Sequence, residues 1–158
     1  MARFNESPRA GAVAEMITFC HCRAWAEGVV DGRPYADVPA LTTTAGELIE
    51  RLDWSGIEEA MSAHPRIGDR VSGADRAARW SLGEQAGVDG SLDALLDGNR
   101  RYEARFGQVF LIRASGRDAV EVLAELERRL TNDVASERDE VRDQLAQITI
   151  GRLRGAFA

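Results

Sequence analysis

Apolar side chains recur along most of this chain at the spacing of an amphipathic α-helix. The pattern predicts helices over about residues 8–28, 40–51, 55–63, 91–106, 117–131 and 134–154, with short helical pieces at 74–80 and 82–87. The apolar run Val109–Ile112 could form a buried strand, but no second strand pattern exists to pair with it, so we expect a buried connector. The sequence therefore predicts an all-α, single compact domain of roughly six to eight helices spanning residues 1–158.

Local signals refine these helices. Ser55-x-x-Glu58 is typical of a capping box, and Ser91 is a candidate N-cap. Pro65 disfavours helical backbone at His64, so the preceding helix should end at His64. The residues expected to face the core include Leu92, Leu95, Leu96, Tyr102, Val120, Leu123, Leu126, Leu130, Val141, Leu145 and Ile148.

Composition narrows the function. The net charge of −6 and a pI near 5.0 argue against a nucleic-acid partner. All 20 basic residues are arginine, which excludes an imine to a lysine side chain as an electron sink. No apolar run is long enough to span a membrane, and no signal peptide or peroxisomal address is present, so we expect a cytoplasmic protein.

The sequence Cys20-His21-Cys22 raises the question of a disulfide or a metal site. In the first predicted helix the two cysteine side chains would diverge by about 200°, which does not suit a disulfide and fits a reducing compartment. A zinc site is also disfavoured, because three consecutive helical residues point in different directions and His64 is the only other histidine. We expect no metal, and a surface or interface position for His21.

Two short motifs carry the candidate chemistry. Residues 64–69 read His-Pro-Arg-Ile-Gly-Asp, and residues 81–85 read Ser-Leu-Gly-Glu-Gln. A histidine, a carboxylate and an amide can move protons on a polar heterocycle without a cofactor. Each also has a structural reading: His64 could cap a helix, Ser81-x-x-Glu84 is itself a capping-box pattern, and Arg152 could lie at a helix C-terminus or in solvent. Arg66 and Asp69 are weaker candidates that more readily form a local ion pair.

The two motifs together resemble the OHCU decarboxylases, which act on 2-oxo-4-hydroxy-4-carboxy-5-ureidoimidazoline and complete the conversion of urate to (S)-allantoin. Weaker similarities cover nearly the whole chain in the family's order. They include Arg23-Ala24-Trp25-Ala26, Phe106-Gly107, Phe110-Leu111-Ile112, Arg128 to Asp133 and Arg152-Leu153. Arg113 departs from the pattern, because the family more often has a small or apolar residue there.

The resemblance implies a role for each matching residue. His64 matches the acid/base residue, Glu84 a catalytic or orienting carboxylate, and Arg152 a substrate-binding arginine, for which Arg113 is a rival that the resemblance does not support. The segment from Phe110 to Ala114 matches a connector that lines the pocket and whose backbone groups hydrogen-bond the substrate ring. The predicted substrate-binding residues are Pro65, Ser81, Leu82, Gly83, Glu84, Gln85, Phe110, Leu111, Ile112, Arg113, Ala114 and Arg152.

The resemblance also implies a cofactor-independent decarboxylase that forms a homodimer. Either His64 or Glu84 could move the proton, and Glu84 could instead hold the imidazole tautomer or bind the ureido group. Two other functions fit the same residues. One is a His/Glu hydrolase or isomerase of a related ureide, and the other is a non-catalytic helical interaction module. Convergence of His64, Glu84 and Arg152 on one cavity would favour an enzyme.

Overall fold

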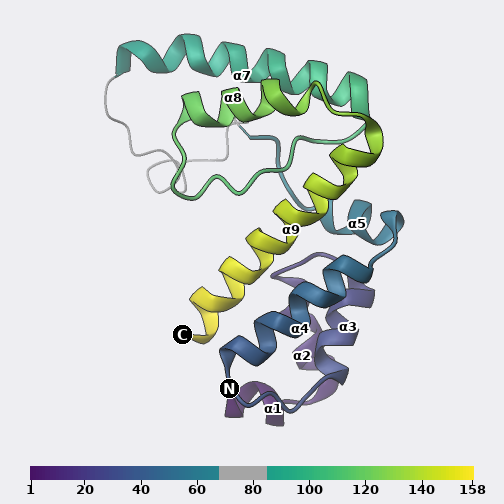
Figure 1. Cartoon of the computed structure of the whole chain (residues 1–158). Coiled ribbons are helices and arrows are strands. Elements are labelled where there is room, and N and C mark those ends of the chain that lie inside the picture. The colour runs from purple at the N-terminus through teal and green to yellow at the C-terminus, as the bar shows by residue number, and fades with distance from the viewer. Residues whose placement is uncertain (68–84) are drawn as a thin grey trace. The chain divides into compact units, whose positions relative to one another are not determined.

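The computed structural model describes residues 1–67 and 85–158, and for residues 85–92 it describes the backbone alone. These residues form eight α-helices and no strand (Figure 1). The helices are α1 (Ala2–Glu6), α2 (Arg9–Ile17), α3 (Arg23–Asp31), α4 (Val38–Arg51), α5 (Trp54–Met61), α7 (Gln85–Phe106), α8 (Ala119–Arg129) and α9 (Val134–Phe157). The all-α prediction is confirmed for this part of the chain. No described helix is long and apolar enough to cross a membrane.

The chain packs as two compact units. The first contains Met1–His64 and Arg142–Ala158, and the second contains Pro65–Val141. Helix α9 therefore contributes its first residues to the second unit and the remainder to the first.

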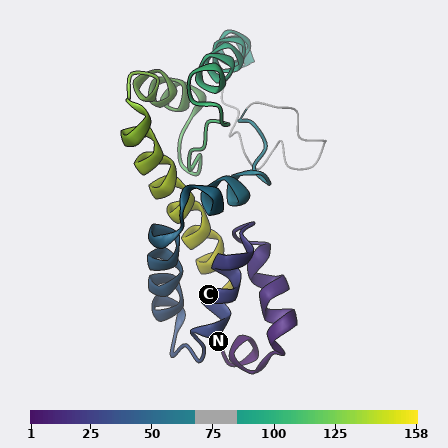
Figure 2. The same ribbon diagram turned by 90° about the vertical axis from the view of Figure 1, so that its right-hand side faces the viewer.

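In the first unit, α3 packs against both α2 and α4 (Figure 2). The indole nitrogen of Trp25, which is almost fully buried, donates to the Ala45 carbonyl at 3.0 Å and joins α3 to α4. Arg142 on α9 donates to the Leu52 carbonyl at 2.7 Å, at the end of α4. The bond supplies a partner for a carbonyl that the helix end leaves unpaired. Side-chain hydrogen bonds therefore join these helices in addition to apolar packing.

The single helix expected over residues 8–28 is wrong. The structure has two helices there, α2 and α3, separated by a turn at residues 18–22. The Thr18 hydroxyl donates to the Glu15 carbonyl at 2.7 Å, a local bond that competes with continuation of the helix. Cys20 and Cys22 lie in or at the edge of this turn and are both fully buried, so the apolar pattern continues across the break. The second helix also extends past Gly28 to Asp31.

Helix α5 begins and ends elsewhere than expected. Its N-cap is Asp53, whose carboxylate accepts from the Gly56 backbone N–H at 2.9 Å, so the predicted capping box at Ser55 is wrong. The Ser55 hydroxyl donates to the same carboxylate. A charged carboxylate is a stronger acceptor than a hydroxyl, so Asp53 rather than Ser55 accepts from the free N–H group. The helix ends at Met61, three residues before the expected end at His64.

The second unit is built around α7 and α8, which pack side by side (Figure 1). Helix α7 is helical from Gln85, so Ser91 lies inside it and has no helix start to cap, contrary to expectation. It ends at Phe106, and the next residue, Gly107, has a φ of 73°, the left-handed conformation that glycine adopts without strain. The core contains six buried residues. They are Leu95, Tyr102, Phe110, Ile112, Val122 and Leu126.

Helix α8 differs from expectation in the residues that it buries. Val120 was expected to face the core but is 65% exposed, and Val122 is buried instead. Asp118 and Glu121 form a capping box that starts the helix, which sets the rotation of its first turn. Val109–Ile112 forms no strand and is a connector in which Phe110, Leu111 and Ile112 are buried, as predicted.

Candidate functional site

The backbone holds His64 in a defined position just after α5. Its N–H donates to the Met61 carbonyl at 2.8 Å, and its ring Nδ1 lies 3.1 Å from the Ala60 carbonyl oxygen. A carbonyl oxygen can only accept, so this hydrogen bond places the ring proton on Nδ1. The other ring nitrogen, Nε2, then carries the lone pair.

The environment of this imidazole favours its uncharged form. The His64 ring is half-buried, and Nε2 is buried with no hydrogen-bond partner among the residues described here. Burial lowers the pKa of His64 below its usual value, and the nearby positive charge of Arg152 lowers it further, against an opposing contribution from the Ala60 hydrogen bond. A neutral imidazole with an unpaired Nε2 is suited to accept a proton from a bound ligand.

Arg152 lies close enough to His64 to act on its charge, and both residues belong to the first unit. One guanidinium nitrogen, Nη1, donates to the Phe19 carbonyl at 2.9 Å in the turn between α2 and α3. The side chain is exposed on the last helix. The structure therefore brings together two of the three residues that were expected to converge, a base and a cation that can bind an anionic group.

The same turn contains the two cysteines. Both are free and fully buried. Burial, with the neighbouring Cys22 thiol, raises the pKa of Cys20 to about 12, and burial also raises the pKa of Cys22. The helical position from which we argued against a disulfide is wrong, but the thiols are unpaired as expected. His21 between them is exposed, as predicted. Within the described residues, no three His, Cys, Asp or Glu side chains are grouped to hold a metal.

The residues that follow His64 are held by α7. Arg66 forms a two-point ion pair with Glu103, with Nε–Oε1 and Nη2–Oε2 distances of 2.5 and 2.6 Å. Asn99, one turn earlier and 2% exposed, donates from Nδ2 to the Ile67 carbonyl at 2.8 Å. Arg66 therefore forms a long-range ion pair with Glu103. The local ion pair that we expected for Arg66 and Asp69 stays a prediction, because Asp69 lies outside the described residues. Pro65 is exposed.

A buried arginine holds the connector between α7 and α8. Arg129 on α8 is fully buried, and its Nη1 donates to the Leu111 carbonyl at 2.7 Å. Sequence reasoning did not single out Arg129 as a site residue. Helical spacing offered a signal. Arg129 lies seven residues after Val122 and three after Leu126, so it shares the helix face of these two buried residues. Of the other connector residues, Arg113 is exposed and Ala114 is intermediate.

The second motif cannot be placed. Ser81, Leu82, Gly83 and Glu84 lie outside the described residues, and Gln85 is described only as the first backbone position of α7. The proposed contribution of this motif to a common site with His64 and Arg152 therefore stays a prediction.

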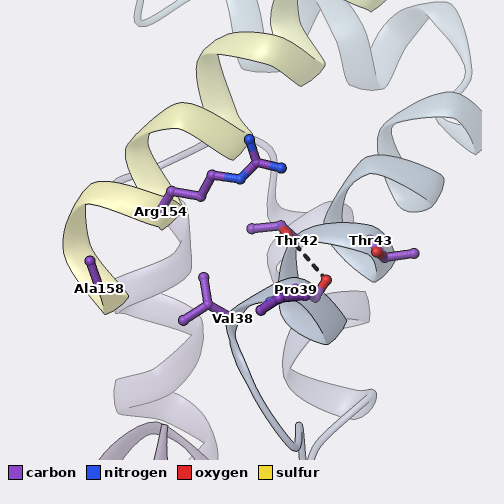
Figure 3. Close-up of a pocket in the computed structure, with 6 residues that line it drawn as sticks. All are labelled: Val38, Pro39, Thr42, Thr43, Arg154 and Ala158. Carbon is purple, nitrogen blue, oxygen red and sulfur yellow. Dashed lines mark hydrogen bonds between the residues drawn. The ribbon is translucent and has the colours of Figure 1, made fainter.

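A cavity of about 400 Å³ lies at another place in the first unit (Figure 3). It is bordered by the start of α4 and the end of α9, and none of the predicted site residues lines it. Its lining residues are Val38, Pro39, Thr42, Thr43, Arg154 and Ala158. The Thr42 hydroxyl in its wall is bonded to the Pro39 carbonyl at 3.1 Å. The lining is mainly apolar and holds no proton-transfer residue, so the cavity is not the candidate catalytic site.

The chain is similar to known proteins both in sequence and in structure. The family model described as OHCU decarboxylase matches residues 5–154. The chain is 32% identical over 142 residues to the 2-oxo-4-hydroxy-4-carboxy-5-ureidoimidazoline decarboxylase of Amia calva, covering 84% of this chain and 79% of that protein. It is 28% identical over 146 residues to the uric acid degradation bifunctional protein TTL of Arabidopsis thaliana, covering 88% of this chain and 45% of that longer protein.

Two solved structures have the same fold. A crystal structure of OHCU decarboxylase in the presence of (S)-allantoin matches with a TM-score of 0.78 and 25% identity, over 90% of this chain and 96% of that one. A crystal structure of (S)-allantoin synthase matches with a TM-score of 0.73 over 98% of this chain and 52% of that one. At 17% identity, the second match concerns the fold alone.

Proposed function

Because this chain belongs to the OHCU decarboxylase family, we propose that His64 is the acid/base residue with which it converts OHCU to (S)-allantoin. The enzyme is a carboxy-lyase that acts in urate degradation. The observation that carries the proposal for His64 is its ring geometry: the proton is fixed on Nδ1, and the lone pair of Nε2 is buried and unpaired within the described structure.

The substrate itself explains why no electron sink is needed from the protein. The ring carbon that bears the carboxylate also bears a hydroxyl group and adjoins an imine carbon. When the carbon–carboxylate bond breaks, its electron pair forms a double bond to the former imine carbon, and the imine electrons move to the ring nitrogen, which takes a proton. The hydroxyl then loses its proton to become a carbonyl, and the former imine carbon gains one. Apart from CO2 release, the remaining steps are proton transfers.

In this scheme the Nε2 atom of His64 accepts the hydroxyl proton and returns a proton to one face of the ring. The lowered pKa of His64 suits the first transfer, because the imidazole is neutral when substrate binds. Since the Ala60 carbonyl already accepts the Nδ1 proton, fixing the tautomer does not require Glu84. We therefore assign Glu84 to the ureido N–H groups of the substrate. Ser81, Leu82, Gly83 and Gln85 complete the proposed contacts around it.

Arg152 is the proposed anchor for the substrate's carboxylate or a ring oxygen. Its bond to the Phe19 carbonyl through Nη1 supports this role, because that bond fixes the orientation of the planar guanidinium. Arg113, the rival anchor, is exposed on the connector. We propose that the pocket walls are Pro65 and the connector residues Phe110, Leu111, Ile112 and Ala114, whose peptide groups hydrogen-bond the ring.

The decisive experiment is to generate OHCU from urate in the reaction mixture with the two preceding enzymes and to follow circular dichroism. Uncatalysed decay gives racemic allantoin, so an optical signal reports the enzyme. We expect rapid formation of the (S) enantiomer. Racemic product at the background rate would reject the assignment.

We further propose that the enzyme is a homodimer in the cytoplasm. The apolar stripe of α9 is used mainly within the chain, since Val141 and Leu145 are fully buried, while Val134 remains 54% exposed. The family resemblance and the prevalence of two-fold dimers are the support for a dimer. Light scattering coupled to size exclusion should give about twice the chain mass of 17.3 kDa. A fully active monomer at micromolar concentration would reject the dimer.

A further inference from the structure

Two opposite charges are buried together in the second unit. The side chains of Arg129 and Glu137 are 0% and 1% exposed. The guanidinium donates to Oε1 of Glu137 from Nε at 2.9 Å and from Nη2 at 2.5 Å, and the Tyr102 hydroxyl donates to the same oxygen. Removing both charges from water is costly, and apolar residues of similar size in their place often give a protein that is equally stable or more stable. Packing alone is therefore a weak reason for this pair.

The adjacent residue shows that the burial is specific to position 129. Arg128 is half-exposed and forms ion pairs with Glu125 and Glu140. Two neighbouring arginines on one helix thus have opposite environments, one in solvent and one in the core. They form a matched pair for experiments, because the two arginines differ in burial and in the groups that they bond.

Arg129 holds one peptide group of the connector. Its third nitrogen, Nη1, donates to the Leu111 carbonyl at 2.7 Å, and its guanidinium lies 4.7 Å from the centre of the Phe110 ring. Leu111 is buried, and residues 109–114 are neither helix nor strand, so they lack the regular hydrogen bonds of those elements. Glu137 orients the guanidinium from the other side. The pair therefore fixes both the position and the rotation of the peptide at Leu111.

We propose that Arg129 and Glu137 are positioning residues for the decarboxylation, acting through the connector. This inference rests on the proposed function, in which the connector's peptide groups hydrogen-bond the substrate ring. Arg129 donates to the Leu111 carbonyl, and we assign the substrate contacts to the neighbouring peptide groups of the connector, which this bond holds in place. Neither charged side chain is assigned to the substrate, and a shift of about 1 Å in such a segment can cost about 10²-fold in rate.

The test compares Arg129→Met and Arg129→Lys with Arg128→Met. Each variant is assayed for (S)-allantoin formation at a temperature at which its melting curve shows that it is folded. Arg129→Met should raise KM at least about tenfold, with a smaller fall in kcat, because uniform binding to the ring is weakened. Arg129→Lys should recover part of the loss, and the acid limb of the pH profile should not move. Arg128→Met should keep the kinetic constants of the wild type.

A purely structural role gives a different result. A folded Arg129→Met enzyme with a lower melting temperature and unchanged KM and kcat would overturn the proposal, as would an equal loss in Arg128→Met. If Arg129→Met does not fold, Arg129→Lys and Glu137→Gln decide in the same way, since unchanged KM in both would overturn it. The ¹⁵N chemical shift of the Ile112 amide should move in the Arg129 variants, because that amide shares a peptide group with the Leu111 carbonyl. A wild-type enzyme that makes no (S)-allantoin would instead reject the proposed function.

Discussion

The Nδ1 atom of His64 lies 3.1 Å from the carbonyl oxygen of Ala60, four residues earlier in the chain. This relationship leaves Nε2 as the ring nitrogen that carries the lone pair. Because the acceptor is a backbone carbonyl at the end of α5, no side-chain substitution removes it directly. The reactive tautomer is thus a property of how the helix ends and of the turn that follows.

Replacing His64 by asparagine should abolish most activity and leave the fold intact. A positioned proton-transfer group is typically worth about 10²–10⁴-fold in rate, and the asparagine amide can still donate to the Ala60 carbonyl. Steady-state kinetics by circular dichroism and a thermal melt would measure both effects. His21→Asn is the matched control, because His21 is exposed and makes only a minor contribution to the lowered pKa of His64, so most activity should remain. Near-normal turnover in His64→Asn would remove this residue from the mechanism.

The pH dependence should follow the lowered pKa of His64. In the proposed mechanism activity needs the neutral ring, so the acid limb of kcat/KM should lie below the usual histidine pKa of about 6.5. Since Arg152 contributes to the lowering, Arg152→Gln should move the pKa of His64 upward. An NMR titration of the imidazole in the free enzyme measures this without substrate, and a pKa at or above 6.5 in the wild type would contradict the prediction.

The same shift has a consequence for stability. The unfolded chain protonates at about pH 6.5, and the folded chain protonates only at lower pH, so the unfolded state binds more protons between the two pKa values. The contribution of His64 to stability is therefore fully present above pH 6.5 and is lost as the pH falls toward the folded pKa. Chemical denaturation across this range should show the free energy of unfolding rising with pH, and His64→Asn should reduce that slope. An unchanged slope would indicate equal pKa values in the two states.

Replacing Arg152 by lysine should weaken substrate binding even though the positive charge is kept. A lysine ammonium cannot bond the Phe19 carbonyl and present a second planar pair of donors, so KM should rise about tenfold or more, as for loss of a charge-assisted hydrogen bond. Arg154→Lys, two residues later on the same helix, should have little effect. If Arg152→Lys kept the wild-type KM while Arg113→Lys lost affinity, Arg113 would be the anchor.

The two thiols should be unreactive in the folded protein. Both are fully buried, and the pKa of Cys20 is raised to about 12, so almost no thiolate exists near neutral pH. An aromatic disulfide reagent should label neither cysteine until denaturant is added, when both should react. Fast labelling of the native enzyme would show that the turn at residues 18–22 opens readily.

Periodicity predicted the helices because each one buries an apolar face, and that signal persists over several turns. It did not reveal the break between α2 and α3, because Cys20 and Cys22 are buried in the turn itself and the apolar pattern continues through it. The start of α5 was misplaced because Asp53 and Ser55 are both good caps, and only the structure shows which one accepts from the free N–H groups.

The site was predicted unevenly for similar reasons. The prediction that His64 is a site residue came from its motif, and its proximity to Arg152 was expected from the resemblance rather than from any pattern in the chain. The acceptor at Ala60 left no sequence signal, since every residue has a carbonyl oxygen. Arg129 was missed because a charged residue on an amphipathic helix is usually exposed, and its partner Glu137 lies on the next helix.

The contrast between Arg128 and Arg129 also bears on how this sequence can diverge. At position 128 a lysine or glutamine preserves most of what an exposed ion pair provides, so we expect relatives to vary there without compensation. At position 129 a single exchange strands the buried Glu137 carboxylate, so viable lineages should change the two positions together or neither. Two identical neighbouring residues are thus subject to different evolutionary constraints, one independent and one coupled.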